Sequence, residues 1–371
     1  MSILFDSDDG WIISHLDYLN KIYEIVEDEQ QNKVLNFNES LFKINTQYLR
    51  QNQIDSFKKK DANVNSLKKR RKKKSQILPE DILKENNVVR EIGLKLLDKA
   101  KNLKIFTNTI LDNNEESRLA SKQFYLSKLQ LNYNFHGSNR KEIATIAKFQ
   151  NEKYVFPKNS EFYCYDIREI TKKLNISNRF DLIILDPPWW NKSIRRKRIK
   201  FEESSYKMIY NEELANIPIK NLLHPFGIVA VWCTNSSSQL KYILDELFPS
   251  WNIVFKAKWY WLKVTQNDET ICNFNDSHGK QPYEQLVFGV CSSNINCSLP
   301  DKKVIVSVPS AVHSHKPPLT EILKNFLKEK PKCMEIFARY LLPDWTSWGL
   351  EVLKFQHLSL YSIIETKNII I

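Results

Sequence analysis

The chain has 371 residues, of which 42% are hydrophobic and 26% charged, as is ordinary for a globular protein with one large or two medium domains. Its six cysteines show no paired C-x-x-C spacing, which argues against a structural zinc site and a disulfide framework. No apolar run approaches the length of a membrane span, and a net charge of +12 favours a polyanionic partner.

The N-terminus shows no secretory signal, because Asp6, Asp8 and Asp9 interrupt any apolar region. A soluble intracellular protein without a membrane partner is therefore expected. Residues 1–57 are predicted to be an N-terminal helical segment. Apolar residues between Trp11 and Val26 recur at helical spacing and predict an amphipathic helix that docks on the later domain. A helix that binds another protein is the alternative.

The strongest charge run lies between Lys58 and Lys74, where ten basic residues face the single acid Asp61. Like charges at this density repel one another, so residues 58–78 are predicted to be a disordered basic linker. Two basic clusters with a polar spacer indicate a nuclear import signal or an RNA-binding arm, and a solvated linker is the alternative. We favour the nucleus, with the cytoplasm as a second compartment.

Residues 79–156 are predicted to be a mainly helical accessory region. An apolar stripe from Pro79 to Leu103 has helical spacing, and the segments 121–132 and 141–151 also have helical character. The sequence assigns no role to this region.

From residue 157 onward, short apolar runs alternate with amphipathic stretches. Strands are expected at 162–165, 181–185, 228–232, 253–262, 285–290, 304–308, 333–338 and 350–355, and helices at 240–248 and 319–327. This alternation predicts the α/β class, with a doubly wound and mostly parallel sheet covered on both faces.

The stretch that organises the chain begins with the apolar run 180–185 and continues as Asp186-Pro187-Pro188-Trp189. The prolines end the strand, and open α/β sheets bind ligands at the carboxyl ends of their strands. Asp186 and the Pro187 carbonyl could accept both N–H groups of an adenine amine, with Trp189 stacked on the base. The alternative is a proline-rich turn in which Trp189 only packs.

A basic loop follows this tetrad. Its cations would neutralise phosphates, Trp190 and Tyr206 could stack on unpaired bases, and Lys280 could meet the backbone from the opposite side. A mobile basic surface loop is the alternative. The target adenine must be unpaired or flipped out. The predicted substrate-binding residues are Trp190, Asn191, Lys192, Arg195, Arg196, Lys197, Arg198, Lys200 and Lys280.

Asp186-Pro187-Pro188-Trp189 followed by Asn191-Lys192-Ser193 resembles the adenine-N(6) methyltransferase family named after the 70-kDa methyltransferase-A subunit, and within it the methyltransferase-like protein 4 branch. Further matches follow in order over residues 157–357: Phe248-Pro249-Ser250-Trp251, Trp259-Tyr260-Trp261, Lys280-Gln281-Pro282-Tyr283-Glu284, Ser314-His315-Lys316-Pro317, Glu335-Ile336-Phe337-Ala338-Arg339 and Trp345-Thr346-Ser347-Trp348-Gly349.

The resemblance implies a Rossmann-like methyltransferase domain over residues 157–371, S-adenosylmethionine as cofactor, and adenosine in nucleic acid as substrate. RNA such as small nuclear RNA is favoured over DNA, a monomer is expected to be active, and no metal is needed because a sulfonium already activates the methyl group. Rival interpretations are a non-catalytic nucleic-acid-binding module and a methyltransferase of protein amines.

The implied cofactor contacts replace a glycine-rich loop, since the seven isolated glycines form no G-x-G-x-x-G. Two positions depart from the family, because relatives carry asparagines where this chain has Tyr340 and Leu350. A leucine cannot hydrogen-bond a ribose hydroxyl, so either Glu351 or a water takes over that contact or cofactor binding is weakened. The implied cofactor residues are Asp166 and Ile167 for the adenine, Asp186 for the α-ammonium, Lys316 for the carboxylate, Glu335 and Arg339 for ribose or phosphate groups, and Glu351.

Overall fold

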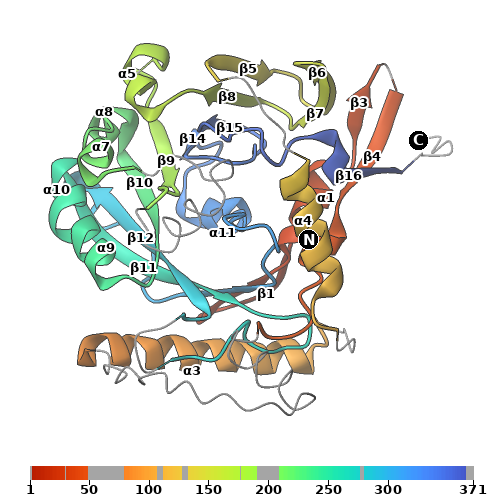
Figure 1. The fold of residues 1–371 in the computed structure, drawn as a ribbon. Helices are drawn as coiled ribbons and strands as arrows, with labels where there is room; N and C mark the ends of the chain where they lie inside the picture. Colours follow the sequence, from red (N-terminus) through yellow and green to blue (C-terminus); the bar gives the residue numbers. More distant parts are fainter. Residues whose placement is uncertain are drawn as a thin grey trace, which may run out of the picture.

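The computed structural model describes residues 2–29, 31–48, 79–106, 112–127, 133–175, 177–189, 209–275 and 280–364. Its strands form one eleven-stranded and one five-stranded sheet (Figure 1). The basic run 58–74 and the loop 190–200 lie outside the described residues, so the predictions made for them stay predictions.

The large sheet is mixed but mostly parallel, which confirms the predicted α/β class. Parallel pairing runs without interruption from β10 through β9, β14 and β15 to β8, while β12 is antiparallel to both of its neighbours. The strands in spatial order are β1 (Ile3–Ser7), β2 (Gly10–Ile13), β13 (Val304–Ser307), β11 (Ile253–Lys263), β12 (Tyr283–Cys291), β10 (Leu223–Cys233), β9 (Phe180–Leu185), β14 (Cys333–Ile336), β15 (Trp345–Trp348), β8 (Ser160–Cys164) and β5 (Phe135–Asn139).

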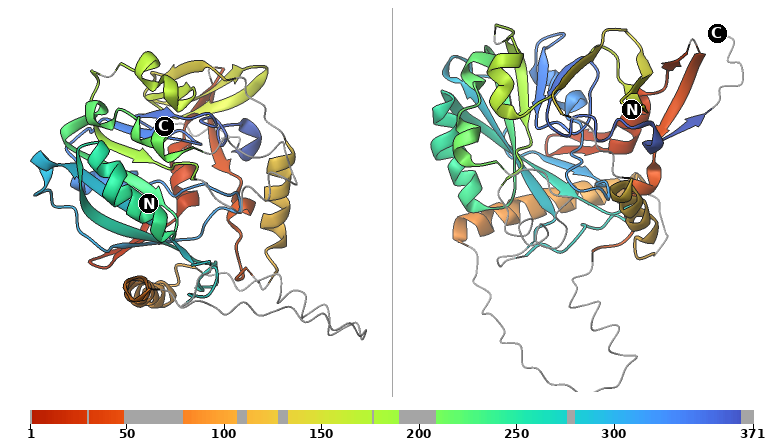
Figure 2. Two further views of the ribbon diagram at one scale, coloured as in Figure 1. Left: turned by 60° about the vertical axis from the view of Figure 1, so that its left-hand side comes forward. Right: turned by 45° about the horizontal axis from the view of Figure 1, so that its top comes forward.

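Strand β9 is buried on both faces, as its continuous apolar sequence predicts. Ile183 and Leu185 pack in one core cluster, while Leu182 and Ile184 pack in another. The first cluster also includes buried residues of a row of short helices, which cover this side of the sheet (Figures 1 and 2). These helices are α5 (Ile170–Lys173), α7 (Asn211–Ala215), α8 (Ile219–Leu222), α9 (Ser237–Tyr242), the π-helical turn η3 (Ile243–Leu247) and α10 (Phe248–Ser250).

Two longer predictions of helix are confirmed, and one is shortened. The stretch 79–103 forms α3 (Glu80–Asn102), which packs against β13 and β2, and the stretch 240–248 is helical throughout. The stretch 319–327 contains only α11 (Thr320–Leu323) and the 3-10 turn η5 (Lys324–Phe326). No helix in the described ranges is both long and apolar enough to cross a membrane.

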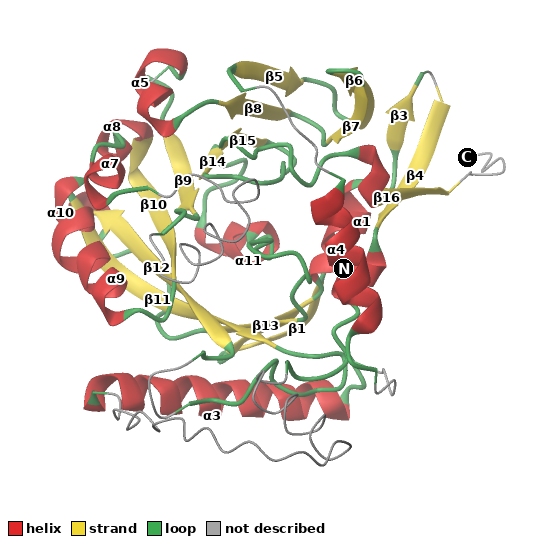
Figure 3. Cartoon of the chain, viewed as in Figure 1, coloured by secondary structure: helices red, strands yellow, loops and turns green. Residues whose placement is uncertain are grey.

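The mainly helical character predicted for residues 1–57 is wrong for the described part of that segment (Figure 3). The predicted helix from Trp11 to Val26 consists of β2, α1 (His15–Ile22) and β3 (Val26–Asp28), followed by β4 (Gln31–Phe37) and the 3-10 turn η1 (Glu39–Phe42). The physical reason is that β2 extends the large sheet through parallel pairing with β13. Local periodicity does not reveal a partner almost 300 residues away.

The prediction of a mainly helical region over residues 79–156 is wrong beyond α4 (Glu115–Leu126). Helix α4 overlaps the predicted segment 121–132, but it begins and ends earlier in the chain. The segment 141–151 is not a helix but half of a hairpin between β6 (Ala144–Phe149) and β7 (Glu152–Phe156). Its turn residues Gln150 and Asn151 have φ of 48° and 68°, the left-handed conformation that two-residue hairpin turns require.

The small sheet joins distant parts of the chain in the order β16-β4-β3-β6-β7, with β16 spanning Tyr361–Ile364. The strand predicted at 350–355 is wrong, because the chain turns there and buries Val352 and Leu353. The strand nearest to residues 350–355 in the sequence is β15, which ends at Trp348. The remaining short 3-10 turns are η2 (Ile167–Glu169), η4 (Ser292–Asn294) and η6 (Leu358–Leu360).

Candidate active site

The tetrad 186–189 leaves the carboxyl end of β9, between β10 and β14, as its position after a buried strand predicts. The Asp186 N–H donates to the Ile336 carbonyl at 3.2 Å, and the Trp189 N–H donates to the Pro187 carbonyl at 2.8 Å. Trp189 is buried, and its indole N–H donates to the Trp232 carbonyl at 2.8 Å. The tetrad is therefore fixed by main-chain hydrogen bonds and by packing.

Asp186 lies between two cations from distant segments. Arg339, just after β14, places Nη1 2.5 Å from Asp186 Oδ2, and Lys316 places Nζ 3.6 Å from Oδ1. Only 6% of Asp186 is exposed, and both cations are also buried. Removing one partner from such a buried group leaves an uncompensated charge, so the three side chains depend on one another.

The two cations extend this contact into an alternating row of charges. Lys316 also pairs with Glu284 of β12, which in turn pairs with Lys263 at the end of β11. At the other end, Arg339 Nε lies 3.2 Å from Glu351, which pairs with Lys354 at 2.7 Å. We call this set the ion row; its members are Lys263, Glu284, Lys316, Asp186, Arg339, Glu351 and Lys354.

The ion row shifts the pKa values of Lys316 and Glu284. Burial opposes the charged form of Lys316, but the carboxylates of Asp186 and Glu284 outweigh it and raise the pKa of Lys316. Burial likewise opposes ionisation of Glu284, but the ammonium groups of Lys263 and Lys316 lower the pKa of Glu284. Lys316 and Glu284 are thus held charged, with the Lys316 ammonium 5.1 Å from the Trp232 ring centroid.

Glu335, on β14, is the exception among the buried acids. Burial and the nearby Asp186 carboxylate together raise the pKa of Glu335 to about 8, against the opposing effect of Arg339. Near neutral pH its carboxyl group is therefore mostly protonated and can donate a hydrogen bond.

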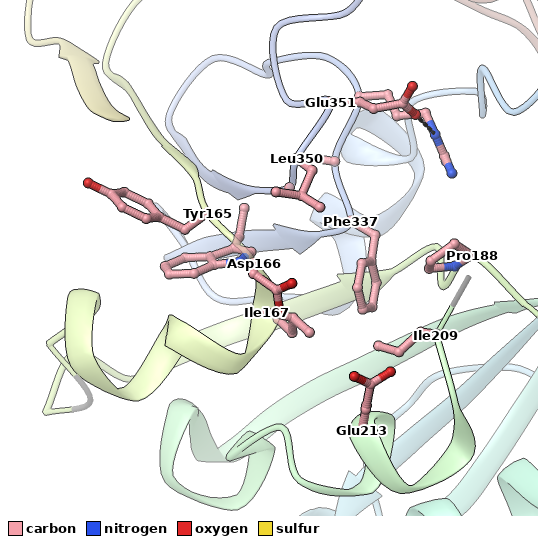
Figure 4. A pocket seen from close by; sticks show the side chains of 13 residues that line it. Tyr165, Asp166, Ile167, Pro188, Ile209, Glu213, Phe337, Leu350 and Glu351 are labelled. Carbon is pink, nitrogen blue, oxygen red and sulfur yellow. Dashed lines mark hydrogen bonds and ion pairs between the residues drawn. The ribbon is translucent and has the colours of Figure 1, made fainter. Parts of the chain in front are cut away.

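A pocket of about 610 Å³, partly open to solvent, adjoins the ion row (Figure 4). Of the predicted cofactor residues, Asp166, Ile167, Arg339 and Glu351 line it, together with Pro188 of the tetrad. Asp186, Lys316 and Glu335 are not part of its lining; Arg339 connects Asp186 to the pocket. The other lining residues are Tyr165, Ile209, Glu213, Phe337, Ala338, Trp348, Gly349 and Leu350.

Local backbone geometry shapes two of the pocket walls. Phe337 follows β14 with φ of 66°, a conformation that is unusual for a bulky residue and turns the chain sharply at the pocket. A side chain at Gly349 would place its Cβ 2.5 Å from the Ala338 carbonyl oxygen, so this wall requires glycine. Asp166 is the N-cap of η2, where it accepts hydrogen bonds from the Arg168 N–H at 3.1 Å and from the Arg168 guanidinium at 2.8 and 2.7 Å.

The two departures from the family pattern have different surroundings. The Tyr340 hydroxyl donates to the Lys316 carbonyl at 3.2 Å, so Tyr340 supports the segment that carries a predicted cofactor residue. Leu350 lines the pocket beside Glu351, where its side chain can form no hydrogen bond.

Several neighbours of the site were not predicted from the sequence. Glu284 lies in the motif 280–284 but had no predicted role, and Lys263 is one of three lysines in β11, so nothing in the strand's sequence singles it out. Lys280, a predicted substrate residue, is described and lies over the Tyr48 ring at 5.2 Å, away from the pocket lining. The described residues contain no group of three or more His, Cys, Asp or Glu side chains that could hold a metal ion.

Comparison with known proteins gives a consistent family. Residues 180–351 match the MT-A70 family model. The human N(6)-adenine-specific methyltransferase METTL4 is 37% identical over 62% of this chain and 49% of its own length. The Caenorhabditis elegans DNA N6-methyl methyltransferase is 29% identical over 84% of this chain and 88% of its own length.

The N6-methyladenosine RNA methyltransferase MTA1 of Pyricularia oryzae is 32% identical over 63% of each chain. This chain thus spans about half the length of the METTL4 proteins that it matches. The family match includes the tetrad 186–189, Lys316, Glu335, Arg339 and Glu351. This chain therefore contains an MT-A70 family domain, as the order of its motifs predicts.

Proposed function

We propose that this chain is an S-adenosylmethionine-dependent methyltransferase that methylates the N6 amine of adenosine in nucleic acid. RNA such as small nuclear RNA is the favoured substrate, and DNA adenine is the alternative. The observation that carries the proposal is Asp186, held at the end of β9 between Lys316 and Arg339 and beside a lined pocket. The names of the relatives, which include adenine-specific, RNA and DNA N6-methyltransferases, support it.

The pocket residues fit the proposed cofactor. Its walls are mostly apolar with a few charged groups, as in most small-molecule sites. Of the lining residues, Asp166 and Ile167 would hold the adenine, and Arg339 and Glu351 the ribose hydroxyls. Lys316, which lies outside the lining, would pair with the carboxylate. When bound, S-adenosylmethionine supplies a methyl group activated by its sulfonium.

The residues of the tetrad would position the substrate amine. The Pro187 carbonyl accepts the Trp189 N–H, and a carbonyl oxygen has a second lone pair for one N–H of the amine. Asp186 would accept the other N–H, after giving up part of its contact with Arg339. Once that exchange has taken place, the ion row and the main-chain hydrogen bonds hold both acceptors in place, so little further reorganisation is needed at the moment of transfer.

The direct test is chemical. Purified protein is incubated with S-adenosylmethionine carrying a labelled methyl group and with RNA or DNA, and the nucleosides are analysed by mass spectrometry. Labelled N6-methyladenosine, or its deoxy form, is expected and identifies the substrate. The absence of both products with every nucleic acid offered would overturn the proposal.

A second candidate is a nucleic-acid-binding member of the family with weak or absent catalysis. Two observations favour it. Arg339 already forms an ion pair with Asp186, and Leu350 lines the pocket where a hydrogen bond to ribose is expected. Titration calorimetry with S-adenosylmethionine separates the candidates, because a protein of this second kind would show no measurable binding of the cofactor.

We propose that the loop 190–200 binds the phosphates of the nucleic acid, with the run 58–74 as a second basic element. Arg195→Glu with Arg196→Glu should lower the affinity for RNA and flatten its dependence on salt, because fewer counterions are released. The matched control is Lys302→Glu with Lys330→Glu, two exposed cations outside the pocket lining. Equal losses in both double variants would reject a specific role for the loop.

We also propose that the run 58–74 directs the chain to the nucleus and that a monomer is active. Replacing the basic residues of 68–74 with glutamine should redistribute a fluorescent fusion to the cytoplasm. Sedimentation of the protein during turnover tests the monomer.

A further inference from the structure

Glu213 is an acid in the pocket to which neither the sequence nor the family resemblance gives a role. It lies on α7 and lines the pocket together with Ile209. In Figure 4 its carboxylate points from α7 into the pocket, at the end away from Glu351. Its Oε2 accepts the Tyr210 N–H at 3.1 Å, which fixes the side chain at the start of the helix.

The surroundings of Glu213 suit a flat heterocycle. Ile167, Ile209 and Phe337 give this part of the pocket apolar walls. In Figure 4, Ile209 and Phe337 lie between the Glu213 carboxylate and the opposite, charged end. The charged end is formed by the pair of Arg339 and Glu351. A ring held between apolar side chains can be distinguished only at its edges, where polar groups meet it.

Asp166, the predicted acceptor at that edge, is already engaged. Its Oδ1 accepts two hydrogen bonds from Arg168 and its Oδ2 accepts a third. A carboxylate offers about four acceptor positions. Glu213 accepts the Tyr210 N–H through one oxygen and can take a hydrogen bond from a ligand as well. A second carboxylate, that of Glu213, is therefore placed in the pocket to accept a hydrogen bond from the amino group of a ligand.

We propose that Glu213 is a specificity-determining residue of the cofactor site, accepting a hydrogen bond from the exocyclic amino group of the cofactor's adenine. It thereby selects a 6-amino purine over a 6-oxo purine, whose oxygen would face a carboxylate. The proposal rests on the proposed function, because it takes S-adenosylmethionine as the ligand of the pocket.

The test measures binding, not turnover. Titration calorimetry of the full chain compares S-adenosylhomocysteine with its analogue in which inosine replaces adenosine. The parent should prefer the adenine ligand by about tenfold or more, since the 6-oxo group removes a donor and meets a carboxylate. Glu213→Gln should bind the adenine ligand about three- to tenfold more weakly and lose most of that preference, because the glutamine amide can donate to a 6-oxo group.

The variant was chosen to keep the fold. Glutamine serves as well as glutamate in hydrogen-bonding back to the residue that precedes the helix, so Glu213→Gln should melt at the parent's temperature. The control is Glu212→Gln, which removes the same charge from an exposed neighbour on α7 that does not line the pocket. It should leave both affinities unchanged.

The outcomes separate this proposal from the one on which it rests. A parent that binds S-adenosylhomocysteine, together with a Glu213→Gln variant that keeps the full preference for the adenine ligand, overturns the role of Glu213 alone. A parent that binds neither ligand overturns the proposed function and this proposal with it. Loss of preference in both Glu212→Gln and Glu213→Gln would show a general charge effect and also reject the assignment.

Discussion

Two neighbouring residues, His315 and Lys316, belong to two buried clusters, one of uncharged aromatic rings and one of ion pairs. Lys316 enters the ion row, where every member has an opposite charge beside it. His315 enters an aromatic cluster, where its ring lies 4.3 Å from that of His15 and stacks on Phe355 at 3.9 Å. Neither imidazole hydrogen-bonds through a ring nitrogen within the described part of the chain.

The difference is one of charge. Burial lowers the pKa of His15 to about 3, and it lowers the pKa of His315 well below its usual value, so both rings are neutral. The ion row instead keeps its charges and compensates each one. The ion row can therefore bind and orient polar groups, whereas the adjoining aromatic cluster of His15, His315 and Phe355 contributes only packing.

The largest effect is expected from removing the centre of the ion row. Asp186→Ala, or the isosteric Asp186→Asn, removes an acceptor for the substrate amine and should slow methyl transfer by about 100- to 1000-fold or more. RNA affinity should stay nearly unchanged, because phosphate contacts lie elsewhere. Single-turnover methylation and filter binding measure the two quantities. Parent-like methylation by either variant would refute the catalytic assignment.

The next effect tests compensation within the ion row. Glu284→Gln leaves Lys263 and Lys316 without their shared anion and should cost about 3–5 kcal/mol in the free energy of unfolding. Adding Lys263→Met should recover part of that loss, since one of the two cations is removed. Urea unfolding measures both, with the exposed Glu246→Gln as control. No recovery in the double variant would mean that the ion pairs are not energetically coupled.

The neutral cluster should respond to acid. Because the pKa of His15 falls from 6.5 in the unfolded chain to about 3 in the folded chain, only the unfolded chain takes up this proton between those values. Stability is therefore present above pH 6.5 and is lost as the pH falls, by up to about 1.4 kcal/mol per pH unit for this residue. His15→Phe should reduce that slope in urea unfolding measured from about pH 4 to 6.5. An unchanged slope would contradict a buried neutral ring.

The smallest effect concerns Glu335, which stands beside the ion row but is neutral like the histidines. Its folded pKa of about 8 lies above the usual 4.5, so its contribution to stability is full at low pH and is lost as the pH rises through 8. Glu335→Gln should flatten the fall in unfolding free energy between about pH 6 and 8. A parent whose stability does not fall over this range would show that Glu335 is ionised in the folded protein.

The sequence was most informative where one stretch determines its own structure. The apolar run before Asp186 predicts β9, and the stripe from Pro79 to Leu103 predicts α3; both are confirmed. It was misleading where a weak helical pattern spanned several short elements, as in residues 141–151. There the local pattern competes with strand pairing, which depends on partners elsewhere in the chain.

In the site, too, local motifs could be predicted from the sequence and contacts between distant segments could not. Resemblance to the family locates Asp166, Ile167, Arg339 and Glu351, which share one pocket. The ion row could not be predicted in this way, because its contacts join residues that lie far apart in sequence. The sequence did not indicate a role for Glu213 either, since an acid near the start of a helix is ordinary and only the fold places it in the pocket.

The parallel order of β9 and β14 has a consequence for synthesis on the ribosome. Asp186 leaves the ribosome well before Arg339, which follows it by 153 residues, and β14 must insert beside β9 before the two can meet. Such distant pairing is slow to form. Newly made chains should thus pass through a stage in which Asp186 lacks its guanidinium partner, and a chaperone that shields the open edge of β9 would raise the yield of competent protein.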